Sequence, residues 1–177
     1  MITNADIWTK LITLFRHACT TMDMTEYVVK KGAQHTITSF VQPLILINKI
    51  GSTNLSWVAD KYDYNEEQQK LHRLETLLQE VTYQVTVLRR DTADDVNSPS
   101  DVVMKLQMYL NGMTGIDKAR DLGIQLGRIS AARHPIWVDE GQAYESAPSF
   151  DLTVFMEQSI DMLQEGVDQI ISQIGGV

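Results

Sequence analysis

The amino-acid sequence predicts an α+β fold, in which a single mixed or antiparallel β-sheet has its helices packed on one face. Two stretches of strict alternation predict long strands that are buried on one side. In residues 150–162, Phe150, Leu152, Val154, Met156, Ile160 and Met162 hold even positions, whereas most odd positions are polar. In residues 80–87, the apolar positions are Val81, Tyr83, Val85 and Val87. Most predicted strands follow one another without intervening helices, which is typical of the α+β class.

Residues 4–20 have the pattern of an amphipathic helix. Asn4 is the expected N-cap, and the apolar stripe recurs at three- and four-residue spacing: Ile7, Leu11, Leu14, Phe15 and Ala18. A short strand over 27–30 should end at Gly32, and residues 37–50 have strand composition, with Pro43 marking an edge, a bulge or the start of pairing. The Gly-Ser-Thr-Asn sequence at 51–54 predicts a turn that leads into a strand over 55–59.

Residues 65–79 fit two structures. Glu66 and Glu67, followed by leucines at 71, 74, 77 and 78, match a short helix with acidic residues at its positive end. The same residues run without a breaker into the strand at Val81, which favours an extended segment. Periodicity alone therefore leaves this segment open.

The second half of the chain begins with a strong helix start at Ser98-Pro99-Ser100-Asp101. Serine can cap, proline suits the first helical position, and Asp101 complements the helix dipole. The buried stripe should be Val102, Val103, Leu106, Tyr109 and Leu110. Gly112 should end this helix, a second helix should cover 116–122, and Gly123 should precede a strand over 124–129. Residues 135–138 should lead through a turn around Gly141 to the last strand, and residues 167–174 fit a short tail helix.

Composition narrows the class of protein. A length of 177 residues predicts one domain, 1–177, and a net charge of −8 argues against a nucleic-acid-binding surface. The lone Cys19 cannot form an internal disulfide, which fits assembly in a reducing cytoplasm. No apolar run is long enough to span a bilayer, and the N-terminus has no secretion signal pattern.

The sequence shows no pattern of catalytic, cofactor-binding or metal-binding residues. The four histidines, His17, His35, His72 and His134, lack acidic or cysteine partners at ligand spacing. The acidic residues at 91, 94 and 95 lack the glycine and glutamate of a calcium loop, and the pairs at 66–67 and 139–140 are sequence neighbours that cannot share a proton in a strand. We therefore predict that the protein is not an enzyme and binds no cofactor or metal.

Three aromatic residues, Trp57, Tyr62 and Tyr64, form a cluster in a polar, acidic setting. Such side chains are enriched at protein interfaces, although packing into the core from a loop explains them equally well. They are the candidate subunit or partner contacts.

The order of elements resembles the tail-terminator (tail-completion, neck) proteins of long-tailed bacteriophages. The features that carry the resemblance span most of the chain: the N-terminal helix, Gln42-Pro43-Leu44-Ile45, the strand over 80–87, the helix after Ser98, Leu122-Gly123-Ile124, Arg128-Ile129, Tyr144-Glu145 and Phe150-Asp151-Leu152. The tail beyond Gln158 departs from the family pattern. The resemblance favours a protruding β-hairpin arm, rather than a helix, for residues 65–79.

The resemblance implies a structural virion protein that is assembled in the host cytoplasm and located at the neck. It would cap the tail tube as a homo-oligomeric ring, usually a hexamer, stop tube polymerisation and offer the head-joining surface. Its partners would be the tail tube, the tail sheath and head-completion proteins, with no membrane or specific nucleic-acid contact, and DNA could pass through the lumen. The alternatives are a head-completion or adaptor (connector) protein, a tail-tube subunit and, from another class, a small cytoplasmic enzyme.

Overall fold

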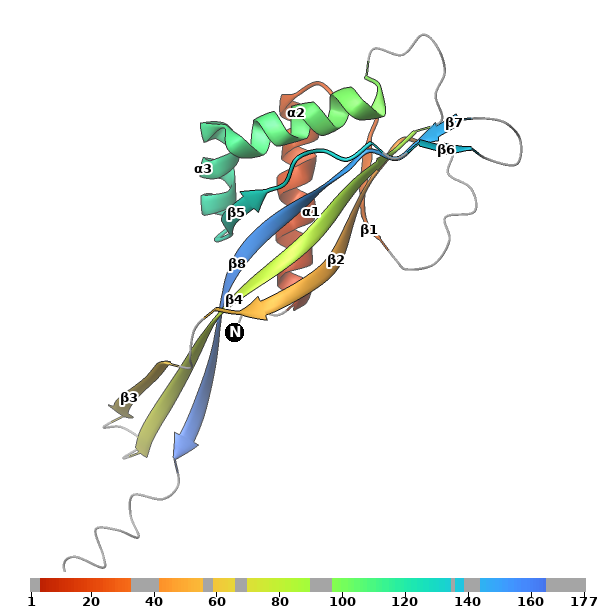
Figure 1. The fold of residues 1–177 in the computed structure, drawn as a ribbon. Coiled ribbons are helices and arrows are strands. Elements are labelled where there is room, and N and C mark those ends of the chain that lie inside the picture. Colours follow the sequence, from red (N-terminus) through yellow and green to blue (C-terminus); the bar gives the residue numbers. More distant parts are fainter. Residues whose placement is uncertain are drawn as a thin grey trace, which may run out of the picture.

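The computed structural model describes residues 4–32, 42–55, 59–65, 70–89, 97–134, 136–138 and 144–164. In this part of the chain, helices and a curved sheet make up the body, and β4 and β8 continue well beyond it (Figure 1). In chain order the elements are α1 (Asn4–Thr21), β1 (Val28–Lys31), β2 (Leu44–Asn54), β3 (Ala59–Asn65), β4 (Lys70–Leu88), α2 (Pro99–Asn111), α3 (Met113–Asp121), β5 (Gln125–Ile129), β6 (Ile136–Val138), β7 (Tyr144–Ser146) and β8 (Ser149–Gln164).

The main sheet is mixed. Its strand order is β1-β2-β4-β8-β5, and β3 pairs with β4 beyond the end of β2. β1 pairs with β2 in parallel, and the other neighbours are antiparallel. β6 and β7 form a separate two-stranded ribbon. This architecture confirms the predicted α+β class with helices on one face of the sheet.

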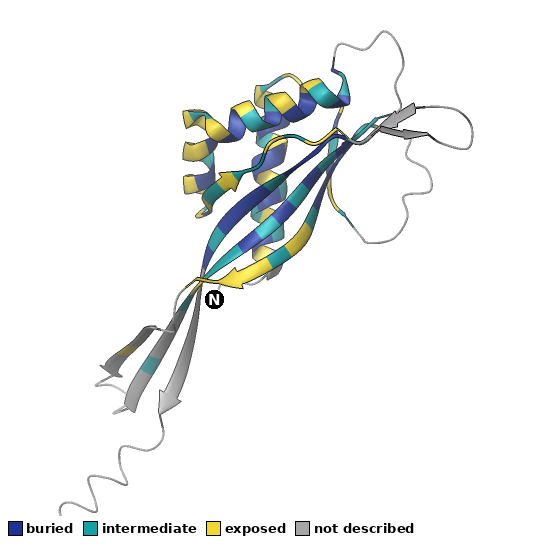
Figure 2. Cartoon of the chain, in the orientation of Figure 1, coloured by how far each residue is buried: buried dark blue, intermediate teal, exposed yellow. Residues whose placement is uncertain are grey.

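One face of the sheet packs against the helices to form the core. The buried residues of the two central strands are the ones that the alternation predicts: Val81, Tyr83, Val85, Val87, Phe150, Leu152, Val154 and Met156. The stripes of α1 and α2 belong to the same cluster, and Figure 2 shows the buried residues concentrated between helices and sheet. The odd-numbered, polar positions of β8 are less exposed to solvent than the alternation predicts, because Thr153 is only 8% exposed. β5 is irregular between Leu126 and Ile129, and Gly127 lies against Thr153 and Phe155.

The predicted helix signals around α2 are confirmed. Ser98 is the residue before the helix and caps it. Its Oγ accepts a hydrogen bond from the Asp101 backbone N–H (3.2 Å) and donates one to Asp101 Oδ2 (2.7 Å). Gly112 ends α2, and α3 begins at Met113, three residues earlier than predicted. Gly123 has a φ of +65° and donates its N–H to the Arg120 carbonyl (2.8 Å), which ends the helical path before β5.

The structure corrects the prediction for residues 51–54 and decides between the two alternatives for residues 70–79. The predicted turn at 51–54 is wrong, because these residues continue β2 and pair with residues 79–82 of β4. A bulge between Lys49 and Gly51 absorbs one residue, and the long β4 strand supplies a backbone partner that local turn chemistry does not reveal. Residues 70–79 are strand, as the resemblance indicates and the leucine spacing does not.

Several other expectations fall outside the described residues. These are the strand over 37–41, the turn around Gly141 and the tail helix over 167–174. α1 begins at Asn4 itself, and the side chain that was expected to cap it is also outside the described part.

Candidate interaction surface

The most distinctive feature of the molecule is an arm, which we define as β3, residues 70–78 of β4 and residues 157–164 of β8. β4 is its central strand, with β3 on one side and β8 on the other. At ~3.3 Å per residue, the nine residues of β4 in the arm extend roughly 30 Å beyond the body. Figure 1 shows this segment projecting past the end of α1 and β2. The protruding arm that the resemblance implies is therefore present.

The arm continues the alternation of the core. The register between β4 and β8 is unbroken from Leu71 opposite Gln164 to Thr86 opposite Ser149. Positions in phase with the buried residues of β4 and β8 continue into the arm on both strands: Leu71, Arg73, Glu75 and Leu77 of β4, and Gln158, Ile160, Met162 and Gln164 of β8. Four of these eight positions are apolar, and they lie in a region that no described helix covers (Figure 1).

The structure brings two of the three predicted contact residues to this arm. Tyr62 lies opposite Arg73 in the register of β3 and β4, and Tyr64 lies opposite Leu71. Both tyrosines therefore occupy positions in the core-facing phase of the sheet. Trp57 lies outside the described residues, so its proposed role stays a prediction.

Two exposed apolar side chains lie at the bulge of β2 and just past its end. Ile50, at the β2 bulge, is 53% exposed, and Leu55 is 47% exposed. The Leu55 backbone N–H donates to the Leu78 carbonyl (2.9 Å), which holds the end of β2 against β4. The sequence did not predict these exposures, because Ile50 fits an ordinary strand position and Leu55 fits the start of the predicted strand over 55–59.

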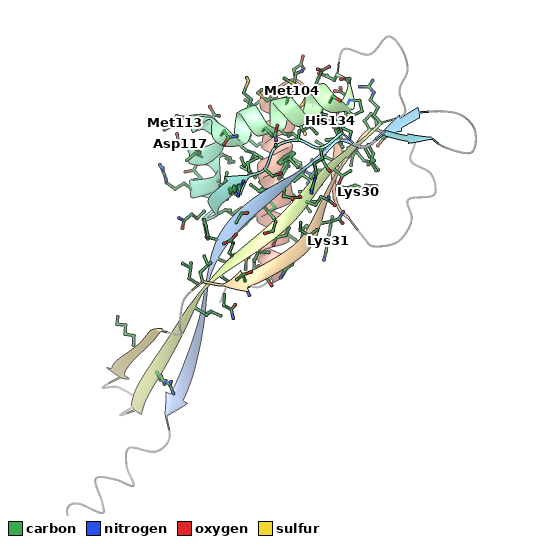
Figure 3. All side chains as sticks on the ribbon, in the orientation of Figure 1. Lys30, Lys31, Met104, Met113, Asp117 and His134 are labelled. Carbon is green, nitrogen blue, oxygen red and sulfur yellow. The ribbon has the colours of Figure 1, made fainter. Side chains whose placement is uncertain are left out.

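A second exposed apolar surface lies on α2 and α3. Met104, Met108 and Met113 are 63%, 69% and 69% exposed, and Ile116 is 36% exposed. Figure 3 shows Met104 and Met113 on the outer side of the two helices. Methionine side chains adapt to irregular partners. In the sequence, Met104 and Met108 lie off the buried stripe of α2, and this position is what indicates their exposure.

A pocket of ≈ 360 Å³ opens at the root of the arm. Its lining is mostly apolar, with two cations: Ile7, Lys10, Leu78, Arg120, Gly123, Ile124, Gln125, Val154, Phe155 and Met156. These lining residues include no carboxylate, imidazole, hydroxyl or thiol, and Arg120 also pairs with Asp117 (3.1 Å). Lys10 is therefore the one lining residue whose side chain could act as a nucleophile or a general base, and no second such group lies beside it in the lining.

Three titratable side chains of the body contact, or are buried by, other parts of their own chain. His17 Nδ1 lies 2.6 Å from the Tyr109 hydroxyl, and His134 Nδ1 lies 3.3 Å from Ser100 Oγ. Cys19 is buried, and burial raises the pKa of its thiol from 9.0 to about 11. Within the described part of the chain, no three acidic, histidine or cysteine residues gather as a metal site would require.

The surface of the body also carries a basic pair. Lys30 and Lys31 are exposed on β1, an edge strand, and Lys31 Nζ lies 4.8 Å from the centre of the Trp8 ring (Figure 3). Asp151 of β8 forms an ion pair with Arg133.

No helix among the described residues is long and apolar enough to cross a membrane.

Comparison with known proteins indicates which class of protein this chain belongs to. A search of curated proteins gives no match. The family described as E217 gateway protein gp29 matches residues 7–163, which include most of α1 and all of the sheet and arm except Gln164. This match supports the phage structural class but does not distinguish a tail terminator from other structural proteins of the virion. The chain belongs to the E217 gateway protein gp29 family of phage structural proteins.

Proposed function

We propose that this protein is the tail terminator at the phage neck. It caps the tail tube as a homo-oligomeric ring of six copies, stops tube polymerisation and provides the surface to which the head joins. Membership of a phage gateway family supports a structural role at the junction of head and tail. The order of helices and strands along the chain supports the more specific terminator role.

The observation that carries the proposal is the arm. It is a three-stranded extension that projects beyond the body, whereas the described helices pack only on the body. Extensions of this kind gain their stability from a partner. In a ring, the arm reaches either the neighbouring subunit or the end of the tube, and Tyr62 and Tyr64 lie within it.

The partners that follow are the tail tube, the tail sheath and head-completion proteins. The acidic balance, with 23 acidic and 15 basic residues, suits a ring through which DNA passes without being held. No catalytic step is part of this proposal, and the absence of catalysis stays a prediction.

Deletion of the gene from the phage that carries it separates this function from that of an adaptor. Loss of a terminator leaves tails of irregular length, because nothing stops tube growth, and these tails do not join heads. Loss of a head-completion protein leaves tails of uniform length beside heads that lose their DNA. Electron micrographs of the lysate, with the deleted gene restored on a plasmid as the control, give the tail-length distribution. Uniform tails in the deletion would contradict the proposal.

A further inference from the structure

We propose that neighbouring copies join through their arms by strand pairing, with the outer edge of β8 over 157–164 binding the outer edge of β3 in a second copy. This inference rests on the proposed ring and specifies how its subunits are held. It concerns backbone groups, and it identifies a second copy of this chain as the occupant of both edges.

Both edges of the arm are without a strand partner in the described part of the chain. β5 pairs with β8 only as far as Phe155, which lies opposite Gln125, and β8 then continues for nine residues to Gln164. β3 pairs with β4 on one side only. Unpaired strand edges present rows of N–H and C=O groups that readily accept another strand.

The hydrogen bonds of the body show which residues of β8 direct their backbone groups to that edge. Ser149 exchanges two backbone hydrogen bonds with Arg133 (2.7 and 2.9 Å), and the Ser130 N–H donates to the Asp151 carbonyl (2.9 Å). By contrast, the carbonyl of Pro148 accepts from Val87 of β4 (3.0 Å). Odd-numbered residues of β8 therefore face the β5 side. Because the register with β4 has no shift, Glu157, Ser159, Asp161 and Leu163 face the open edge in the arm.

The two edges are suited to each other in a cyclic assembly. β3 has seven residues and the arm part of β8, 157–164, has eight, so their lengths are similar. Both strands are antiparallel to β4, so they run in the same direction. Rotation about an axis along the arm would therefore place β8 of one copy beside β3 of the next as a parallel pair. Such a head-to-tail contact uses different edges on the two partners and closes into a ring.

The dimensions agree with an open lumen. Six arms of three strands would give a barrel of about eighteen strands, and barrels of roughly this size leave an aqueous channel. With strands ~4.8 Å apart and tilted by ~40°, the diameter between opposite backbones would be about 36 Å. A β8-to-β8 contact, in contrast, would be isologous and would stop at a dimer.

Engineered cysteines test this pairing without ambiguity about which chain is cross-linked. Ser159→Cys is combined with one cysteine on the same face of β3: Ala59→Cys, Lys61→Cys, Asp63→Cys or Asn65→Cys. Within one chain β4 separates these positions by two strand spacings, about 9.5 Å, which is beyond the reach of a disulfide. Any β3-to-β8 disulfide therefore joins two copies. The native Cys19 is buried and does not interfere.

The double variants are introduced into the phage, and purified particles are oxidised and run on a non-reducing gel. We expect one of the four to give a ladder of linked oligomers that a reductant collapses, while Ser159→Cys alone stays monomeric. Linked dimers from Ser159→Cys alone would overturn the proposal in favour of β8-to-β8 pairing. Particles with normal tails and no linkage in any double variant would overturn the strand pairing while leaving the terminator role intact.

A proline variant tests the same edge independently. Ser159→Pro removes an outward N–H and leaves the ladder with β4 in place. We expect Ser159→Pro to melt within a few degrees of wild type and to lose assembly into particles, whereas Ser159→Ala keeps it. Normal incorporation of a folded Ser159→Pro would overturn the proposal.

Discussion

Ala59 and Ser159, one hundred residues apart in the sequence, occupy the same cross-strand row of the arm, one on each side of Thr76. The same relationship repeats at Lys61, Leu74 and Asp161. β4 thus organises the whole arm, and the two strands that flank it leave their outer edges to solvent or to a partner.

The central strand gives a direct test of the core. Val85 is fully buried and pairs with Ile47 and Phe150, whereas Thr86 is half-buried in the opposite phase. Val85→Asp should lower the free energy of unfolding by about 4 kcal/mol or more, because it buries an unpaired carboxylate. Thr86→Asp should be far milder. Chemical denaturation of the two purified variants checks this, and equal stabilities would show that the phase of β4 is wrong.

Asn97 connects three parts of the body and should be sensitive to truncation. Its carbonyl accepts from the Tyr27 hydroxyl (2.9 Å) and from Arg89 (2.8 Å), and its amide donates to Glu26 Oε1 (2.8 Å). Asn97→Ala removes the side-chain hydrogen bonds to the charged groups of Glu26 and Lys105, which should cost roughly 2 kcal/mol of stability. Asn111→Ala, at the exposed end of α2, is the matched control. A change in melting temperature no larger than that of the control would contradict the role given to Asn97.

High pH should destabilise the protein through buried acids that must stay protonated. Burial raises the pKa of Tyr83 from 10.0 to about 12, and that of Cys19 from 9.0 to about 11. Because both folded-state pKa values are raised, the stabilisation that these groups provide is complete below pH 9 and is lost between pH 9 and 12. Tyr83→Phe keeps the edge-to-face contact with Trp8 and should retain more of its stability from pH 10 to 12.

Melting curves of wild type, Tyr83→Phe and Cys19→Ala across this range separate the two contributions. Identical pH profiles for wild type and Tyr83→Phe would show that the Tyr83 hydroxyl is not protected by folding. The lower part of the range, pH 9 to 11, belongs to Cys19 and should be flatter in Cys19→Ala.

The aromatic residues of the arm region should serve assembly rather than folding. Replacing Trp57, Tyr62 and Tyr64 with serine leaves the described core cluster untouched. We expect the variant to melt near the wild-type temperature and to lose ring formation or tube capping, because large aromatics are common interface anchors. Complementation of a deletion phage followed by imaging measures the outcome. Tails of normal length joined to heads would eliminate the contact, and an unfolded variant would place these residues in the core.

The parts of the fold that the sequence predicted are those governed by local chemistry. Alternation set the phase of β4 and β8 in the body, and Ser98 with Asp101 set the start of α2. Long-range pairing decided the rest. The composition around Gly51 predicts a turn, yet pairing with β4 makes Gly51 part of β2. The leucine spacing of 70–79 fits a helix, yet pairing with β3 and β8 makes this segment a strand.

The candidate surface was only partly predictable for a related reason. Tyr62 and Tyr64 were identified as aromatics in a polar setting, but their shared position on the arm depends on register. The exposure of Met104 and Met108 could not be predicted, because the position of an apolar residue off a helical stripe does not show whether another element covers it. The open edge of β8 follows only from where β5 stops pairing.

The terminator role is tested most directly by imaging intact tails at their head-proximal end by cryo-electron microscopy, with this chain located in the density. The proposal predicts a single ring of six copies on the last ring of the tail tube, with the arms meeting around the lumen. This chain in the head, at the distal end of the tail, or repeated along the tube would contradict the proposal.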